Sequence, residues 1–439
     1  MLNTSIRKKL AAVLACFMLT SVLTGCAGSA EKKQLDNELE TIISDKDHPL
    51  AAAAVGVVKD GKIAYANTVG TARFDTNAKA NADTKYRIAS VSKMITAIAV
   101  MQLVEQGKID LQGDVQDYLG FDLRNPNFPD TPITVSMLMS HTSSIRESDA
   151  SPYNMPIGHD LKEFFEEGSE YCGPDRWAPA EEAPGKFFEY TNLNYGILGT
   201  IIEKVSGERF DQYMTAHIFE PMGLTCSFNP ATMSKEAQDQ IGTLYRKKTG
   251  DNYDPNGTWT AQCDDFTDGY PADGEFADYK IGSNATVFSP QGGLRVSVKD
   301  LCAFVQMFSA GGTYNGKQIL KKETLDMMFT PVWTYDPQTE NGDTYYDLMN
   351  CYGNGVQIFT NTSGDRIVEG QDLPFSGHLG DAYGLFSGVL FDREKGNGIV
   401  YIVGGVGSDP EEYYGDYSTF YKWEEKLMTA AASFAKFDY

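Results

Sequence analysis

A serine and a lysine stand three residues apart in the stretch Tyr86-Arg87-Ile88-Ala89-Ser90-Val91-Ser92-Lys93-Met94-Ile95-Thr96-Ala97. The apolar residues that follow recur at helical spacing up to Gly107, which predicts a helix closed by a glycine. Positions three apart share a helix face, so the Ser90 hydroxyl and the Lys93 amine are expected to meet in its first turn. That turn also offers free backbone N–H groups and the positive end of the helix dipole. A hydroxyl, an amine and oxyanion donors are together the parts of acyl transfer.

The Ser-x-x-Lys pattern alone is weak. It also occurs at Ser5, Ser29 and Ser433, and none of these serines opens an apolar helix. Ser90 by itself also fits an ordinary serine at a helix start, because such serines are common N-caps. The rest of the chain has to decide between the two interpretations.

The N-terminus has the pattern of an export signal. A basic start is followed by the apolar stretch 10–19 and by Leu23-Thr24-Gly25-Cys26. This is typical of a secretory signal peptide and is short for a transmembrane span. The last four residues resemble the bacterial lipobox, which implies cleavage before Cys26 and lipidation of its thiol; the alternative is an ordinary signal peptidase site. We therefore expect a signal peptide at 1–25, a tether at 26–33, and a cell-envelope lipoprotein that faces outside the cytoplasm and is held to the membrane by its lipid only.

The chain is acidic, with 37 basic against 60 acidic residues and a net charge of −23. Removal of residues 1–25 would take away Arg7, Lys8 and Lys9 and no acid, which lowers the net charge to −26. Such acidity argues against nucleic acid and anionic membrane surfaces as partners. A small-molecule or peptide substrate is expected, and the sequence carries no indication of oligomeric state.

The cysteines do not indicate a disulfide scaffold. Beyond Cys26 they are five, widely spaced and without a Cys-x-x-Cys pair: Cys172, Cys226, Cys263, Cys302 and Cys351. A chain of this length can build its own core, so only a single unassigned pair stays open. Asn252 to Gly257 faintly resembles a calcium loop, but its twelfth position is Cys263 and not Glu. No cofactor and no metal site are therefore expected.

Strand-like runs lie at both ends of the chain, at 51–58, 62–69, 355–359, 384–391 and 399–403. Asp60-Gly61 between the first two predicts a hairpin. Terminal helices are expected at 34–46 and 418–436, and the middle, about 109–350, is expected to be mainly helical with a turn-rich insertion at 246–275. These elements predict an α/β fold of the α+β type, with an antiparallel sheet from both termini flanked by helices, as a single domain over 34–439.

Two further patterns complete a set in chain order. Tyr190-x-Asn192 precedes an apolar helix that ends at Gly207, and His378-Leu379-Gly380 precedes a late strand. Ser-x-x-Lys, Tyr-x-Asn and His-x-Gly in this order resemble the penicillin-binding protein and class C β-lactamase-related serine hydrolases. The likeness runs from about Ala51 to Val406 and includes Leu138 to Ser144, where Ser144 replaces the family's glycine. It implies a serine β-lactamase/DD-peptidase-like fold.

The resemblance also implies roles for the matching residues. Ser90 would be the nucleophile and Lys93 the base or proton relay. Tyr190 would share proton transfer, and Asn192 would contact the substrate carbonyl or Lys93. Whether the lysine or the tyrosine is the base stays open at this point.

The third pattern would line the substrate. His378 and Gly380 would belong to the substrate-binding strand, and the backbone N–H groups of Ser90 and Asp381 would form the oxyanion hole. Lys248-Thr249-Gly250 spells the family's usual third pattern but lies mid-chain in a turn-rich segment, so we reject it. Tyr352-Gly353-Asn354 repeats Tyr-x-Asn and is better interpreted as a strand start. His141 is interpreted as a structural hydrogen-bonding residue.

The departure at His378 bears on the substrate. β-Lactamases typically carry lysine there, a full cation that suits a substrate carboxylate, whereas histidine is only partly charged near neutral pH. Relatives with His-x-Gly resemble D-aminopeptidases, other peptidases and esterases. We therefore expect a serine hydrolase that cleaves amide or ester bonds, in D-amino-acid peptides, cell-wall-type peptides or small esters, through an acyl-enzyme on Ser90.

Two alternatives of other kinds are kept. One is a β-lactamase or D-Ala-D-Ala carboxypeptidase, and the other is a non-catalytic surface lipoprotein that resembles penicillin-binding proteins. An unrelated α/β-hydrolase would require Gly-x-Ser-x-Gly, which the chain lacks.

Overall fold

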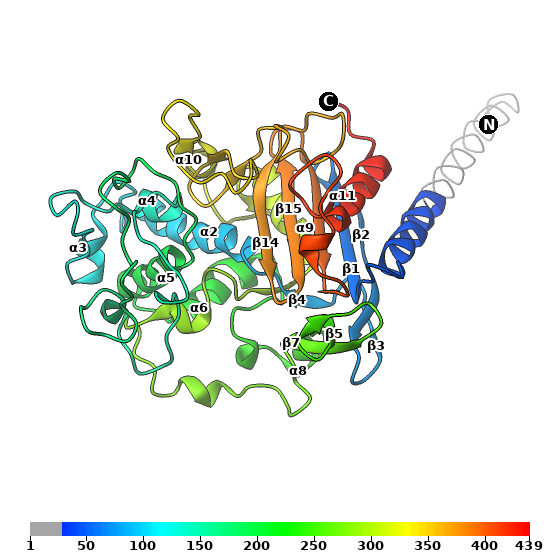
Figure 1. The fold of residues 1–439 in the computed structure, drawn as a ribbon, viewed down its shortest axis with the longest axis horizontal. Coiled ribbons are helices and arrows are strands. Elements are labelled where there is room, and N and C mark those ends of the chain that lie inside the picture. The colour runs from blue at the N-terminus through cyan, green and yellow to red at the C-terminus, as the bar shows by residue number, and fades with distance from the viewer. Residues whose placement is uncertain (1–28) are drawn as a thin grey trace, which may run out of the picture.

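A nine-stranded antiparallel sheet built from both ends of the chain lies at the centre of the fold (Figure 1). The computed structural model describes residues 29–439, so the predicted signal peptide, Cys26 and the start of the tether lie outside the described residues. In spatial order the strands are β11 (Trp333–Thr334), β12 (Cys351–Tyr352), β13 (Gln357–Ile358), β14 (Ser376–Ala382), β15 (Leu385–Asp392), β16 (Asn397–Val403), β1 (Ala52–Lys59), β2 (Lys62–Arg73) and β3 (Ala78–Lys79). The predicted sheet from the two termini is confirmed.

Pairing of β1 with β16 joins the two ends of the chain. Val55 lies opposite Tyr401, more than 300 residues away in sequence, and the pairing is antiparallel. The predicted hairpin between β1 and β2 is confirmed, since Asp60 and Gly61 have φ angles of 50° and 71° between the paired residues Lys59 and Lys62. Two successive left-handed residues match the right-handed twist of the flanking strands.

Both faces of the sheet are covered, because alternate residues of β1 enter different cores. Ala52, Ala54 and Val58 pack in one core with α2 (Val91–Glu105) and α9 (Val298–Ser309). Val55 and Val57 pack in the other with α11 (Lys422–Ala435) and the helical residues 29–43. Successive side chains of a strand point to opposite faces, and both faces are buried here, so nearly every residue of β1 is apolar.

The middle of the chain is less purely helical than predicted. Besides α9, its α-helices are α3 (Val115–Leu119), α4 (Val135–Met139), α5 (Leu193–Ser206), α6 (Phe210–Met214), α7 (Glu220–Met222), α8 (Lys235–Gln238) and α10 (Lys322–Phe329). Strands are interspersed among them: β8 (Arg295–Ser297), which pairs with β4 (Lys85–Arg87) from before α2, and β9 (Thr313–Tyr314), which pairs with β10 (Lys317–Gln318).

The predicted insertion at 246–275 is partly strand, which corrects its assignment as a turn-rich segment. It contributes to a small sheet of β5 (Leu244–Thr249), β6 (Asn252–Tyr253), β7 (Thr258–Cys263) and β17 (Gly405–Val406). Lys248 and Thr249 therefore lie on a strand. The turn residues between β5 and β7 dominated the composition, and pairing with the distant β17 has no local sequence signal.

The terminal helices are also shifted from their predicted bounds. Helical structure covers residues 29–43, so the second part of the predicted tether is helical. At the other end, α11 starts at Lys422, because the Glu425 carboxylate accepts the Asp416 and Tyr417 N–H groups and holds the preceding residues in a loop. Short polar segments beside a helix do not specify its first residue.

Three further features concern the part of the chain that the structure describes. All five cysteines in residues 29–439 are free thiols. No cluster of three or more His, Cys, Asp or Glu side chains in this range is arranged to hold a metal ion. No helix of the same range has the length and apolar character that a bilayer crossing requires.

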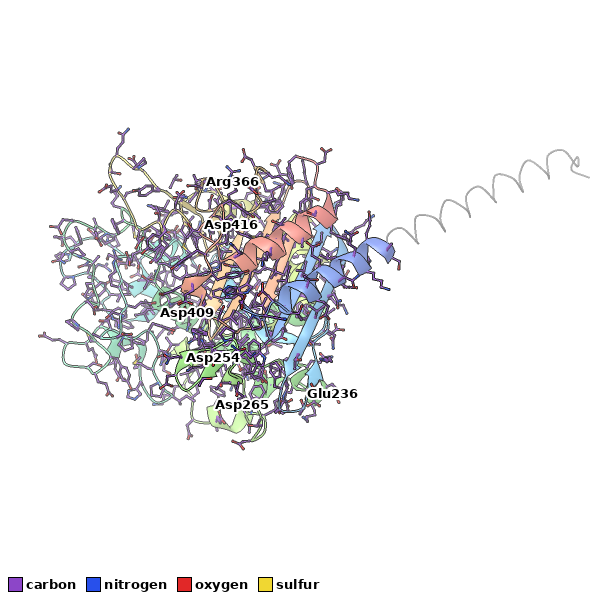
Figure 2. All side chains as sticks on the ribbon, turned by 45° about the vertical axis from the view of Figure 1, so that its right-hand side comes forward. Glu236, Asp254, Asp265, Arg366, Asp409 and Asp416 are labelled. Atoms are coloured by element: carbon purple, nitrogen blue, oxygen red, sulfur yellow. The ribbon has the colours of Figure 1, made fainter. Side chains whose placement is uncertain are left out.

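Acidic side chains are spread over the surface. Glu236, Asp265 and Asp416, which come from segments far apart in the chain, are exposed to solvent and are labelled in Figure 2.

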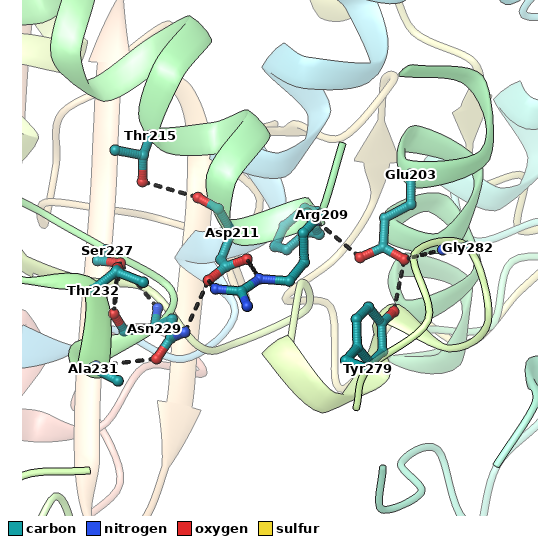
Figure 3. A network of polar contacts seen from close by, with 11 residues as sticks. Glu203, Arg209, Asp211, Thr215, Ser227, Asn229, Ala231, Thr232, Tyr279 and Gly282 are labelled. Carbon is teal, nitrogen blue, oxygen red and sulfur yellow. Dashed lines mark hydrogen bonds and ion pairs between the residues drawn. The ribbon is translucent and has the colours of Figure 1, made fainter. Parts of the chain in front are cut away.

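A buried polar network holds the helical region together next to α5 and α6 (Figure 3). Arg209 Nε donates to Asp211 Oδ1 at 2.6 Å, and the Asp211 side chain is fully buried. Asn229 Nδ2 donates to Asp211 Oδ2 at 2.9 Å, which ties the segment after α7 to α6. Beside it, Glu203 accepts from the Tyr279 hydroxyl and from two backbone N–H groups. A buried charge is tolerated here because it is paired and hydrogen-bonded.

Asp211→Asn removes the buried carboxylate that accepts hydrogen bonds from Arg209 and Asn229, and we expect it to lower the free energy of unfolding by about 1–3 kcal/mol. The measurement is urea unfolding followed by circular dichroism. Glu166→Ala is the matched control, because its ion pair with Lys162 is solvent-exposed, and no measurable change is expected. Equal unfolding free energies for Asp211→Asn and the unmodified protein would contradict the assignment.

Candidate active site

Ser90 lies at the junction between a strained turn and the buried helix α2. Ala89 has a φ of 48°, and Ser90 precedes α2 without capping it through its side chain. Every residue of α2 from Val91 to Leu103 is buried, so the helix is enclosed on all sides. The interpretation of Ser90 as an ordinary capping serine is therefore not supported by the cap geometry.

Lys93 is fully buried in the first turn of α2, and its ammonium group has three acceptors. Nζ donates to Ser90 Oγ at 2.9 Å, to Asn192 Oδ1 at 2.7 Å and to the Gln291 carbonyl at 3.0 Å. The predicted meeting of Ser90 and Lys93 is thus confirmed. Burial lowers the pKa of Lys93 to about 7, against a smaller opposing effect of the Glu147 carboxylate. A lysine with this pKa is partly neutral near neutral pH and can accept a proton.

Tyr190 packs over Lys93 from the segment that leads into α5. Lys93 Nζ lies 4.7 Å from its ring centroid, and its ring stacks on His141 at 4.2 Å. Its buried hydroxyl has no well-aligned hydrogen bond within residues 29–439. Burial raises the pKa of Tyr190 well above its usual value, although the Ser90 side chain lowers it in part. The phenol is therefore neutral in the resting protein.

His378 lies on β14, and both of its ring nitrogens are engaged. Nδ1 donates to the Leu379 carbonyl at 2.6 Å, and Nε2 accepts from the Tyr352 hydroxyl at 2.7 Å. Burial, and next the Lys93 charge, lower the pKa of His378 to about 3. The expected partial charge at neutral pH is therefore wrong: the imidazole is neutral because it is enclosed.

Gly380 brings β14 against the backbone at Ser90. A Cβ at this position would lie 2.6 Å from the Ile88 carbonyl oxygen and 3.1 Å from Ser90 N, too close for any side chain. The turn Tyr383–Gly384 places Ala382 opposite Leu385. Residues of an antiparallel pair alternately face toward and away from the partner strand, so Asp381 directs its N–H away from β15. On that other side of β14, β13 pairs only with Ser376 and Gly377, and no strand among the described residues pairs with Asp381. The Asp381 N–H is thus unpaired by β15 and lies one residue from the glycine that packs beside Ser90 N. That these two N–H groups form the oxyanion hole stays a prediction.

The protein-family model for beta-lactamase matches residues 36–420 of the chain. The chain belongs to the β-lactamase family. This family consists of serine hydrolases, and membership covers all the residues of the site described above.

Individual relatives share less than a third of their residues with the matched part of this chain. Protein flp of Staphylococcus aureus (strain N315) is 29% identical over 211 residues, which are 48% of this chain and 41% of that protein. The chain thus matches less than half of the length of this relative.

Solved structures in the family share the fold. An octameric penicillin-binding protein homologue from Pyrococcus abyssi has a TM-score of 0.62 at 23% identity, with 86% of this chain and 74% of that chain covered. A beta-lactamase/D-alanine carboxypeptidase from Yersinia pestis has a TM-score of 0.62 at 16% identity, covering 92% and 98%. At these identities the likeness concerns the fold.

Ser144 shows why the β-lactamase family prefers glycine at this place. Its φ is 66°, in the left-handed region that glycine adopts without strain. Its buried hydroxyl has no hydrogen-bond partner among the described residues. In the same loop, His141 Nδ1 accepts from the Thr191 N–H at 3.1 Å, which agrees with a structural role.

Two residues that contact the site were missed by the sequence analysis. Tyr352 does lie on a strand, β12, but its hydroxyl also reaches His378 across the sheet. Glu147 accepts hydrogen bonds from Asn192 and from the start of α5. Neither has a local signal, because a repeated Tyr-x-Asn and a single acid in a polar bend are common. Among residues 29–439, Lys248 makes no hydrogen bond or ion pair with the site; its Nζ lies 3.9 Å from the Asp251 carboxylate.

Gly380→Ala is expected to slow the reaction of Ser90 with a fluorophosphonate by about a hundredfold or more, because the added Cβ separates the two N–H donors. The measurement is the labelling rate, followed by intact mass. Gly274→Ala is the control, since its Cβ would meet nothing within 4 Å. Labelling of Gly380→Ala at the unmodified rate would show that β14 does not approach Ser90 as described.

Proposed function

We propose that the protein is a serine hydrolase that cleaves amide or ester bonds through an acyl-enzyme on Ser90. The observation that carries this proposal is the buried Lys93 amine, with its lowered pKa, 2.9 Å from Ser90 Oγ. A surface lysine on an amphipathic helix would have neither property. The pairing of a hydroxyl with a base of pKa near neutrality is what activates a serine nucleophile.

The proposed reaction uses groups that lie around Ser90. The neutral Lys93 amine takes the Ser90 proton as Oγ attacks the substrate carbonyl, and the negative oxygen forms between the N–H groups of Ser90 and Asp381. Tyr190, whose phenol is neutral, gives its proton to the leaving amine or alcohol and is reprotonated from Lys93. A water then attacks the carbonyl of the acyl-Ser90 ester. The Lys93 amine takes the water's proton and passes it to Ser90 Oγ as the bond to Oγ breaks and the acid leaves. The raised pKa of Tyr190 and the lowered pKa of Lys93 favour the lysine as the initial base.

Because the His378 imidazole is neutral, we expect the part of the substrate that lies beside His378 to be uncharged. A D-Ala-D-Ala carboxypeptidase or a β-lactamase binds a carboxylate there, as the resemblance implies, and lysine would supply the charge. The neutral imidazole, with both nitrogens engaged inside the protein, offers neither a charge nor a free donor. Amides and esters, in D-amino-acid peptides, cell-wall-type peptides or small molecules, are therefore preferred to these alternatives. If Ser90 reacts with a serine reagent, the alternative of a non-catalytic lipoprotein is excluded.

The rate of Ser90 labelling by a fluorophosphonate should rise about tenfold per pH unit up to about pH 7 and then level off, because only the neutral amine accepts the proton. Lys93→Arg keeps a cation that does not lose its proton, so labelling should fall by about a hundredfold or more. Intact mass across the pH range measures both.

Two serine variants control this experiment. Ser90→Ala should carry no adduct, whereas Ser92→Ala should keep it, because the Ser92 hydroxyl is buried and accepts from the Leu294 N–H. If the folded unmodified protein is not labelled, the proposal of an acyl-enzyme on Ser90 is refuted, and a non-catalytic lipoprotein becomes the leading explanation.

We further propose that the protein is exported and anchored by a lipid on Cys26, on the support of the sequence alone. Cys26→Ala is expected to move the protein from the membrane fraction to the soluble fraction of a bacterial host. The measurement is immunoblotting of both fractions. An unchanged distribution would count against the anchor.

A further inference from the structure

Glu147 is a half-buried acid that contacts the site through Asn192. It follows the loop His141 to Ser144, and its Oε1 accepts from Asn192 Nδ2 at 2.6 Å. Its Oε2 accepts from the Leu193 N–H at 2.9 Å. Within residues 29–439 this carboxylate makes no ion pair, so its two oxygens are used on Asn192 and on the residue that follows it.

These contacts define which way the Asn192 amide faces. With Nδ2 on the carboxylate, Oδ1 must face Lys93 Nζ, to which it is bonded at 2.7 Å. The flipped amide would place its oxygen against a carboxylate and its NH2 group against an ammonium group, and both contacts are repulsive. Without Glu147, nothing on the side of Asn192 that faces away from Lys93 would favour Nδ2 over Oδ1.

Glu147 also replaces the missing cap of α5. Asn192 occupies the N-cap position but makes no side-chain cap bond, because its amide is engaged between Lys93 and Glu147. The carboxylate instead accepts the first N–H of this 14-residue helix, where negative charge is favourable. The segment that carries Tyr190 and Asn192 is thereby tied to the helix behind it.

We propose that Glu147 is a positioning residue, which holds the Asn192 amide oxygen on Lys93 and secures the segment of Tyr190 to α5. The proposal rests on the proposed function, because it assigns a role around the same base. Its carboxylate is also the one charged group that stabilises the Lys93 ammonium; the other titratable side chains near Lys93 are uncharged at neutral pH: His141, Tyr190, Tyr195 and His378.

The test is the rate of fluorophosphonate labelling of Ser90 from about pH 5 to about pH 9. In Glu147→Gln the ammonium loses its stabilising charge, so the rise in rate should move to lower pH by about half a unit to one unit. The plateau rate should fall about tenfold or more, because the amide is no longer held in one orientation. A purely structural role would change the melting temperature and leave the position of the pH rise unchanged.

Two variants separate charge from geometry. Glu147→Asp keeps the charge but is shorter, so the pH rise should stay in place while the plateau falls. Glu182→Gln removes a nearby acid that pairs with Arg146, and both its pH rise and its plateau should match the unmodified protein. Circular dichroism checks that each variant is folded. If Glu147→Gln does not fold, the plateau rate of Glu147→Asp is the test.

The outcomes distinguish this inference from the proposed function. A labelled wild-type protein whose Glu147 variants keep both the pH rise and the plateau would overturn the positioning role and leave the hydrolase intact. A wild-type protein that is not labelled, while Ser90→Ala behaves identically, would overturn the hydrolase and this role with it.

Discussion

The arrangement of the site depends on the burial of the Lys93 amine. An ammonium group is costly to remove from water unless its donors are satisfied, and here three acceptors from three segments do so. Ser90 comes from the same helix turn, Asn192 from the start of α5, and Gln291 from the loop before β8. These acceptors are neutral, so they satisfy the donors without cancelling the cost of the charge. The amine therefore loses its proton readily, which is the property that an initial base needs.

A comparison with the network around Arg209 shows that the choice of partner sets the charge state. Arg209 and Asp211 are buried together, and their opposite charges stabilise each other in the ionised form. Lys93 is buried among a hydroxyl, an amide and a carbonyl, and His378 among a phenol and a carbonyl. Both of these bases are shifted toward their neutral forms. The same fold thus keeps a structural charge in one place and removes it in another.

The close approach of β14 to Ser90 links the sheet to the site. The sheet requires the two ends of the chain to pair, and α2 packs against the face from which Gly380 meets the Ser90 backbone. On the opposite face, α11 and residues 29–43 bury the other side of β1 and β16. The terminal segments therefore contribute to the site indirectly, by holding in place the sheet that carries β14.

The sequence by itself determined the features that depend on neighbouring residues. The three-residue spacing placed Ser90 beside Lys93, Asp60-Gly61 specified a hairpin, and strand-like runs located the main strands, because helix geometry and turn conformation are local properties. The order of the three patterns also located Tyr190, Asn192 and His378. Tertiary structure alone decided the rest: the neutral state of His378, its bond to Tyr352, the contact of Glu147 with Asn192, and the pairing of β5 with β17. Each of these depends on segments far apart in the chain, and the burial that shifts a pKa exists only once those segments have packed together.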